Sequence, residues 1–216
     1  MRKPDRQAAA AAIDAFLRAL GREPQDDPNL VGTAARVADM FSQDLCAGYG
    51  IDATALLARE TFPVETTSGS AGVVVLRDLA VTTTCPHHLM PATGLATVAF
   101  APQSRLVGIG TVGHALDALS RRLTLQEEIG ENMARALFDA LAPVWAGCRL
   151  VLTHTCMTAR GQRRHGARVE TISIVPAGDR PVAYYLLSGS TSGPAPGSAS
   201  GSAPAQPAHS HDPGSS

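Results

Sequence analysis

Two neighbouring segments with helical periodicity, residues 112–122 and 125–141, stand between strand-like segments on both sides. In each of them large apolar residues recur every three to four positions, so each helix would carry one apolar stripe. The segments that read as strands cover residues 71–84, 94–101, 105–110, 149–157 and 168–176. This order predicts an α+β fold, in which antiparallel strands pack against paired helices.

Local signals within these strands predict two irregular features. A charged pair, Arg77-Asp78, interrupts the first strand, and we expect a bulge there. The turn residues at 102–104 predict a hairpin between the next two segments, 94–101 and 105–110. The two final segments then supply the remaining strands.

Residues 1–70 read as an N-terminal helical region ahead of a main domain at 71–187. One helix is expected over residues 7–20, where apolar residues have helical spacing. A second helix is expected to begin with Thr33 as its N-cap and to run towards Gly48.

Residues 188–216 form a tail of low complexity. Of its 29 residues, 24 are Ser, Gly, Pro or Ala, and none is a large apolar residue. Such a segment cannot bury enough surface to offset the entropy lost on ordering it. We therefore expect a disordered tail.

Charge and hydropathy exclude several classes of function. The chain has 18 Lys+Arg against 19 Asp+Glu, which argues against a nucleic-acid binder because such a protein needs a basic face. No apolar run approaches the roughly 20 residues of a membrane span. The N-terminal segment also lacks the uninterrupted apolar core of a secretory signal. We expect a soluble, cytoplasmic protein.

Cysteines and histidines gather at two places in the sequence. Cys85 and His88 have Cys-x-x-His spacing with His87 between them, and a triplet with His154 and Cys156 follows later in the chain. Thiolates and imidazoles are the donors that zinc prefers. If Cys85, His88 and Cys156 were the ligands, the fourth position would stay open, as catalytic zinc requires. His87 and His154 would then be candidate proton carriers.

Two other interpretations of this cluster remain open. The zinc site would be closed and structural if His154 or His87 were a fourth ligand. Without a metal, the cysteines would be ordinary buried thiols and the histidines hydrogen-bonded residues of the core.

Three motifs make the sequence similar to a known family. They are CPHHLMP at 85–91, SRRLTLQE at 120–127 and HTCMTARG at 154–161. In this order and at this spacing they resemble GTP cyclohydrolase I, and the similarity extends over about residues 30–176. The resemblance implies the tunnelling fold, in which antiparallel sheets and helix pairs assemble into a toroidal homodecamer with pockets between subunits.

The resemblance also implies a role for each matching residue. The family converts GTP and water into formate and 7,8-dihydroneopterin triphosphate with the help of zinc, at the start of pterin and tetrahydrofolate biosynthesis. By position, the resemblance makes Cys85, His88 and Cys156 the zinc ligands. His87 and His154 would be the acid–base residues. The substrate-binding residues would be Gln126, Glu127, Arg160 and Arg36. The Glu127 carboxylate would recognise guanine because it can accept two N–H bonds from that base.

The sequence departs from the family pattern where cations are expected for the triphosphate. Thr111 stands at the position of a lysine and His114 at that of an arginine, and Asp39 replaces another common lysine. A triphosphate carries about four negative charges, and charge-assisted bonds dominate its recognition. Two alternatives follow: a purine-nucleotide cyclohydrolase with altered phosphate specificity, and a non-catalytic homologue that binds a pterin or purine.

Overall fold

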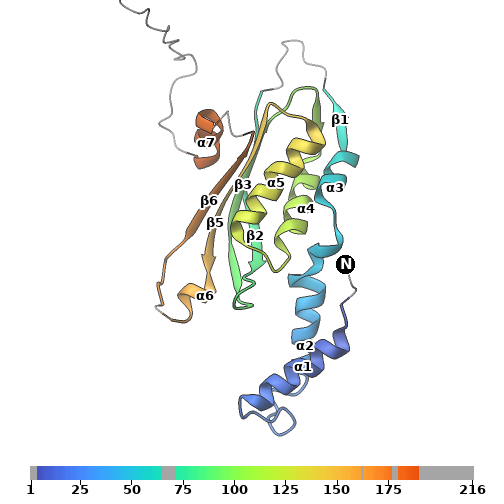
Figure 1. The fold of residues 1–216 in the computed structure, drawn as a ribbon, viewed down its shortest axis with the longest axis vertical. Helices are drawn as coiled ribbons and strands as arrows, with labels where there is room; N and C mark the ends of the chain where they lie inside the picture. The colour runs from blue at the N-terminus through green and yellow to red at the C-terminus, as the bar shows by residue number, and fades with distance from the viewer. Residues whose placement is uncertain (1–3, 65–71, 162, 177–179, 190–216) are drawn as a thin grey trace, which may run out of the picture.

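The chain folds into a four-stranded antiparallel sheet with a pair of helices on one face (Figure 1). The computed structural model describes residues 4–64, 72–161, 163–176 and 180–189. The helices are α1 (Arg6–Ala19), α2 (Thr33–Asp39), α3 (Ala53–Arg59), α4 (Ile109–Ser120), α5 (Gln126–Leu141), α6 (Thr155–Thr158) and α7 (Arg180–Ser188). The strands are β1 (Thr61–Pro63), β2 (Val74–Thr84), β3 (Pro91–Ala101), β4 (Arg105–Val107), β5 (Trp145–His154) and β6 (Val169–Val175). The predicted α+β class is confirmed.

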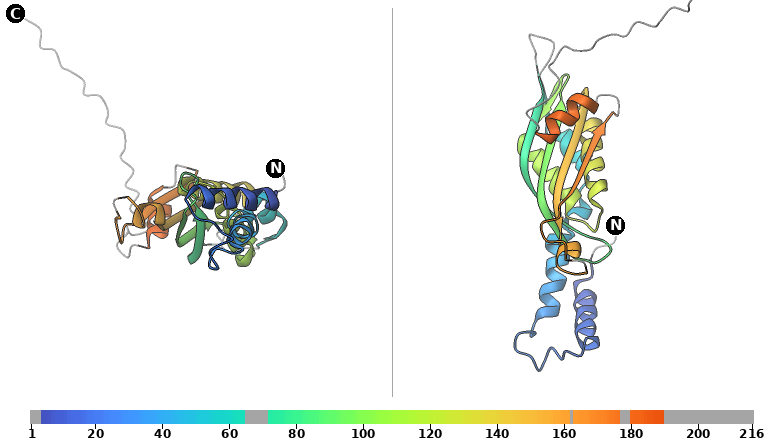
Figure 2. Two further views of the ribbon diagram at one scale, coloured as in Figure 1. Left: turned by 90° about the horizontal axis from the view of Figure 1, so that it is seen from below. Right: turned by 90° about the vertical axis from the view of Figure 1, so that its left-hand side faces the viewer.

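The main core lies between the sheet and the helix pair. The strand order is β2-β3-β5-β6, and each neighbouring pair is antiparallel. The apolar stripes predicted for α4 and α5 face this sheet, so Leu116 and Leu137 are buried against Phe100 and Leu150. On the opposite face, α7 covers one end of the sheet, where Leu187 belongs to a second apolar cluster (Figure 2).

The bulge predicted in the first strand is confirmed. The register of β2 against β3 shifts between Leu76 and Leu79, and Asp78 has a positive φ of 57°. Such a bulge bends the strand and increases its local twist.

The predicted hairpin between 94–101 and 105–110 is wrong. β4 pairs with β1 in a separate two-stranded sheet, and residues 109 and 110 begin α4 instead of ending a strand. Both edges of β3 are already paired, one with β2 and the other with β5, so β3 has no edge left for β4. The strand predicted over 149–157 also ends early, at His154, where α6 begins.

The two N-terminal helices lie side by side and extend away from the sheet (Figures 1 and 2). The helix predicted over 7–20 is confirmed as α1. The N-cap of α2 is Gly32, whose φ of 75° suits glycine, and Thr33 is the first helical residue instead of the cap. After α2 the chain continues through a π-helical segment, η1 (Met40–Leu45), and a 3₁₀ turn, η2 (Ala47–Gly50).

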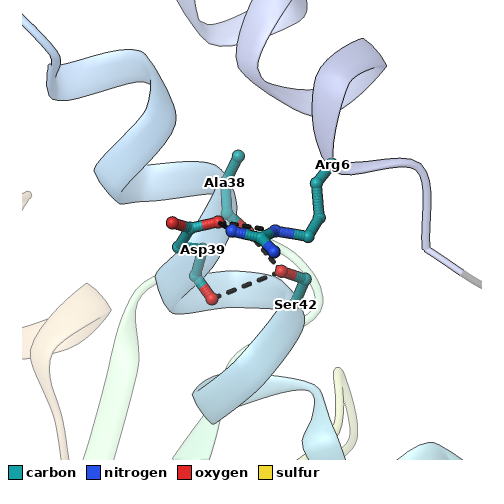
Figure 3. A network of polar contacts seen from close by, with 4 residues as sticks. All are labelled: Arg6, Ala38, Asp39 and Ser42. Atoms are coloured by element: carbon teal, nitrogen blue, oxygen red, sulfur yellow. Dashed lines mark hydrogen bonds and ion pairs between the residues drawn. The ribbon is translucent and has the colours of Figure 1, made fainter.

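An ion pair joins these two helices (Figure 3). The Arg6 guanidinium donates from Nε to Oδ1 of Asp39 at 2.6 Å, and its Nη2 contacts the same oxygen. Beside it, the Ser42 hydroxyl donates to the backbone carbonyl of Ala38 at 2.7 Å. Asp39, which departs from the family's usual lysine, therefore has a structural partner in this chain.

Part of the region assigned to residues 1–70 shares the core of the main domain. Leu57 of α3 is fully buried in the same cluster as the side chains of α4 and α5. Strand β1, which also belongs to this region, pairs with β4 of the main domain through backbone hydrogen bonds.

None of the helices within the described ranges combines the length and hydrophobicity that a membrane span needs. The tail expected to be disordered lies outside the described residues, except for Ser188 and Gly189.

The substitution Gly94→Ala is expected to destabilise the fold because β3 and β5 approach closely at this residue. A Cβ at position 94 would overlap the carbonyl oxygen of Val151 and lie 3.0 Å from the Cα of Leu152. Forcing two backbones apart costs at least about 2 kcal/mol, which thermal unfolding would show as a lower midpoint. Gly110→Ala is the matched control, since a Cβ there meets nothing within 4 Å and gains up to about 1 kcal/mol of helix propensity. Equal midpoints for the two variants would contradict this prediction.

Candidate active site

Three candidate metal ligands meet at one end of the sheet. Cys85 and His88 lie in the turn between β2 and β3, and Cys156 lies in α6, directly after β5. The turn is closed by backbone hydrogen bonds between Cys85 and Met90 and between Leu89 and Cys85, both 2.9 Å long. Because β3 pairs with β2 on one side and β5 on the other, the turn and α6 are brought together.

The geometry of these three residues fits a tetrahedral zinc ion. Their ligand atoms all lie within 4.8 Å of one another, and Cys85 Sγ is 3.8 Å from His88 Nδ1. Zn–S bonds of about 2.3 Å and Zn–N bonds of about 2.0 Å at tetrahedral angles separate ligand atoms by roughly 3.5–3.8 Å. Two thiolates and an imidazole are also donors that zinc prefers. The predicted ligand set is therefore brought together by the fold.

The surroundings of the Cys156 thiol change its pKa. Burial raises its pKa, the adjacent Cys85 raises it further, and the charge of Arg160 lowers it in part. A bound metal ion opposes such a rise because it deprotonates the thiols that coordinate it.

Cys148 differs from the two candidate cysteine ligands, Cys85 and Cys156. It is completely buried in the core, and burial raises its pKa to about 12.

Two further histidines stand beside the ligands. The Nδ1 atom of His87 lies 3.8 Å from Cys85 Sγ. His154 is the last residue of β5, and its Nε2 is 2.8 Å from Oε1 of Gln126. Burial lowers the pKa of His154, and the Glu127 carboxylate raises it in part. A histidine of this kind is neutral at pH 7 and can accept a proton.

The start of α5 presents Gln126 and Glu127 to the site. Glu128 caps this helix, since its carboxylate accepts from the Thr124 hydroxyl at 2.7 Å and from the Leu125 amide at 3.2 Å. These two bonds lower the pKa of Glu128. The run Gln126-Glu127-Glu128 could be interpreted from the sequence as a helix start, but the role of Thr124 as a partner of Glu128 was not predicted.

These residues surround one cavity of about 260 Å³. The predicted site residues that line it are Cys85, His87, His88, Gln126, Glu127, His154 and Cys156. Thr83, Pro86, Thr124, Leu125 and Val169 complete the lining.

Two predicted substrate-binding residues lie outside this lining. Arg160 is exposed beyond α6, although its charge reaches Cys156. Arg36 lies in α2, where its guanidinium donates to the Val31 carbonyl at 3.0 Å and to the Thr33 hydroxyl at 2.9 Å. Within the single chain, Arg36 is therefore held by its own helix start.

Comparisons with known proteins identify the family of this chain. The family model for GTP cyclohydrolase I matches residues 9–179. A GTP cyclohydrolase 1 from Leifsonia xyli subsp. xyli is 37% identical over 174 residues, which cover 78% of this chain and 86% of that protein. Another, from Synechococcus sp. (strain JA-2-3B'a(2-13)), is 34% identical over 168 residues, which cover 78% of this chain and 71% of that protein.

Among solved structures, the apo form of the archaeosine synthase QueF-Like covers 49% of this chain and 94% of its own. Its sequence identity of 15% and TM-score of 0.36 are too low for a comparison of individual residues. The family model, by contrast, spans most of the described chain and includes every residue of the cavity. This chain belongs to the GTP cyclohydrolase I family.

Proposed function

We propose that this protein hydrolyses GTP to formate and 7,8-dihydroneopterin triphosphate, the first step of pterin and tetrahydrofolate biosynthesis. The observation that carries this proposal is the content of the cavity. It joins three residues suited to zinc, two more histidines and the Glu127 carboxylate in a space of about 260 Å³. A pure binding protein has no need of two histidines beside a metal site, so the arrangement favours an enzyme over a non-catalytic homologue.

Each group in the cavity has a task in this reaction. Zinc held by Cys85, His88 and Cys156 would supply the Lewis acid that activates water for attack on the imidazole ring of guanine. The Glu127 carboxylate would accept two N–H bonds from guanine and orient the base, which adenine cannot match. His154 would take up a proton, since burial keeps it neutral at pH 7, and His87 would exchange protons with the opening ring.

A second candidate is a cyclohydrolase that prefers a less phosphorylated purine nucleotide. Thr111 and His114 lie on α4, and neither supplies the permanent charge that a triphosphate favours. The loop after α6 could replace those cations, because it carries exposed arginines at 160, 163, 164 and 168. The two candidates therefore differ in whether this basic loop is sufficient to hold three phosphates.

We also infer that the protein works as a homo-oligomer, with the decamer as the form that family resemblance implies. Arg36 can contact substrate only if it belongs to a neighbouring copy, because within one chain it lies outside the cavity. The N-terminal helices also expose large apolar side chains: Phe16 is 59% and Leu20 is 61% exposed. Light scattering is expected to give a multiple of the 22.4 kDa chain mass, and a monomer would contradict this inference.

The proposed location is the cytoplasm. The four cysteines, Cys46, Cys85, Cys148 and Cys156, are all free thiols. Free thiols are maintained in a reducing compartment, and the two that would bind zinc must stay reduced to do so.

A formate assay on the zinc-loaded protein tests the function and separates the two candidates. GTP, GDP, GMP and guanosine are compared at equal concentration, and pterin absorbance is followed in the same samples. Formate and pterin from GTP alone are expected. Faster turnover of GDP or GMP would favour the second candidate, and no formate from any of the four would contradict both.

A further inference from the structure

The nitrogen and the oxygen of the buried Gln126 amide have different hydrogen-bond partners. Its nitrogen donates to the backbone carbonyls of Leu150 at 3.2 Å and Val169 at 3.0 Å, with the Thr171 hydroxyl also at 3.2 Å. Its oxygen faces Nε2 of His154 at 2.8 Å. Carbonyl oxygens can only accept, so turning the amide by 180° would set its oxygen against two others. Strands β5 and β6 therefore determine the orientation of this amide.

This orientation decides which nitrogen of His154 carries a hydrogen. The amide oxygen of Gln126 is an acceptor only, so His154 Nε2 must be the donor. In the neutral ring, Nδ1 is then the nitrogen with the free lone pair. The same Nε2–H bond persists when the ring is protonated, so the ring keeps one orientation in both states.

We propose that Gln126 is a positioning residue, which fixes the ring of His154 in one orientation and leaves Nδ1 as the nitrogen with the free lone pair. This inference rests on the proposed function, in which His154 is a proton carrier. Gln126 is only 2% exposed, and the two hydrogens of its amide nitrogen are already shared among Leu150, Val169 and Thr171, so the amide has no free donor for a substrate.

Two variants separate positioning from a purely structural role. Gln126→Met keeps a side chain of similar length and removes the contact with His154. Thr171→Val is the matched control, because it removes one partner of the amide nitrogen and leaves the Gln126–His154 bond in place. Gln126→Asn, with a stem one methylene shorter, is measured in the same way and replaces Gln126→Met if that variant does not fold.

The primary measurement is the imidazole N–H proton resonance of protein labelled with ¹⁵N-histidine, with and without zinc. The signal of His154 is assigned by its absence from His154→Ala. Wild type and Thr171→Val are expected to show a slowly exchanging Nε2–H proton, and Gln126→Met is expected to lose it. The kcat for formate release from GTP is expected to fall roughly 10- to 100-fold in Gln126→Met, with KM and zinc content nearly unchanged.

Opposite results would overturn the proposal. They are an Nε2–H signal that persists in Gln126→Met, a rise in KM at constant kcat, or an equal fall in kcat for Thr171→Val. Failure of the proposed function is recognised separately. In that case wild type releases no formate, while the N–H signal still reports whether Gln126 orients His154.

Discussion

Replacing Cys85 or Cys156 by serine is expected to remove bound zinc and, with it, formate release. Serine has nearly the size of cysteine, but its hydroxyl is a far weaker zinc ligand than a thiolate, and only two good ligands would remain. Zinc measured after gel filtration is expected to fall from about one ion per chain to less than about 0.1. Formate release from GTP is expected to fall to background in the same samples.

Cys46→Ser is the matched control for these variants. Cys46 is half-buried beside the N-terminal helices, lines a different cavity and does not belong to the ligand group. This variant is expected to keep its zinc. Stoichiometric zinc in both Cys85→Ser and Cys156→Ser would refute the assigned metal site.

The substitution His154→Ala is expected to reduce formate release while the zinc content stays the same. A general acid–base residue contributes roughly 10²- to 10⁴-fold to a rate, and a loss within this range is expected in kcat. Burial lowers the pKa of His154, so the residue is neutral at pH 7 and becomes protonated only as the pH falls through that lowered value. In wild type, the proton-accepting form is therefore lost towards acid pH, and activity is expected to fall with it.

His165→Ala is the control for this prediction, because His165 lies exposed in the loop after α6 and does not line the cavity. It is expected to leave both activity and zinc unchanged. Loss of zinc from His154→Ala would instead make His154 a fourth ligand, which is the closed structural site that the sequence also allows.

Much of the candidate site could be predicted from residue type and local spacing. Cys85 and His88 share one turn, and the preference of thiolates and imidazoles for zinc does not depend on the rest of the fold. Helices α4 and α5 were predictable for a similar reason, since helical periodicity is a property of consecutive residues. The bulge in β2 was also visible locally, as a charged pair inside an apolar strand.

The pairing of strands could not be predicted in the same way. The expected hairpin would have joined β3 to β4 through a short turn, but β3 pairs with β5, which lies more than 40 residues later. Turn residues show that a strand ends and do not show which strand it will join. Helix α3 was also missed: it is a single short helix, and its burial depends on α4 and α5.

Sequence by itself determined the chemical inventory of this protein: the two thiols, the three histidines, the Glu127 carboxylate and the elements that carry them. Tertiary structure alone decided how they meet. Ala92 lies opposite His154 in the β3–β5 register, which brings α6 and Cys156 to the turn that holds Cys85 and His88. The same register and the packing of α5 bring Gln126 to His154. These contacts join residues far apart in the chain, and their geometry is set by long-range pairing that no local pattern encodes.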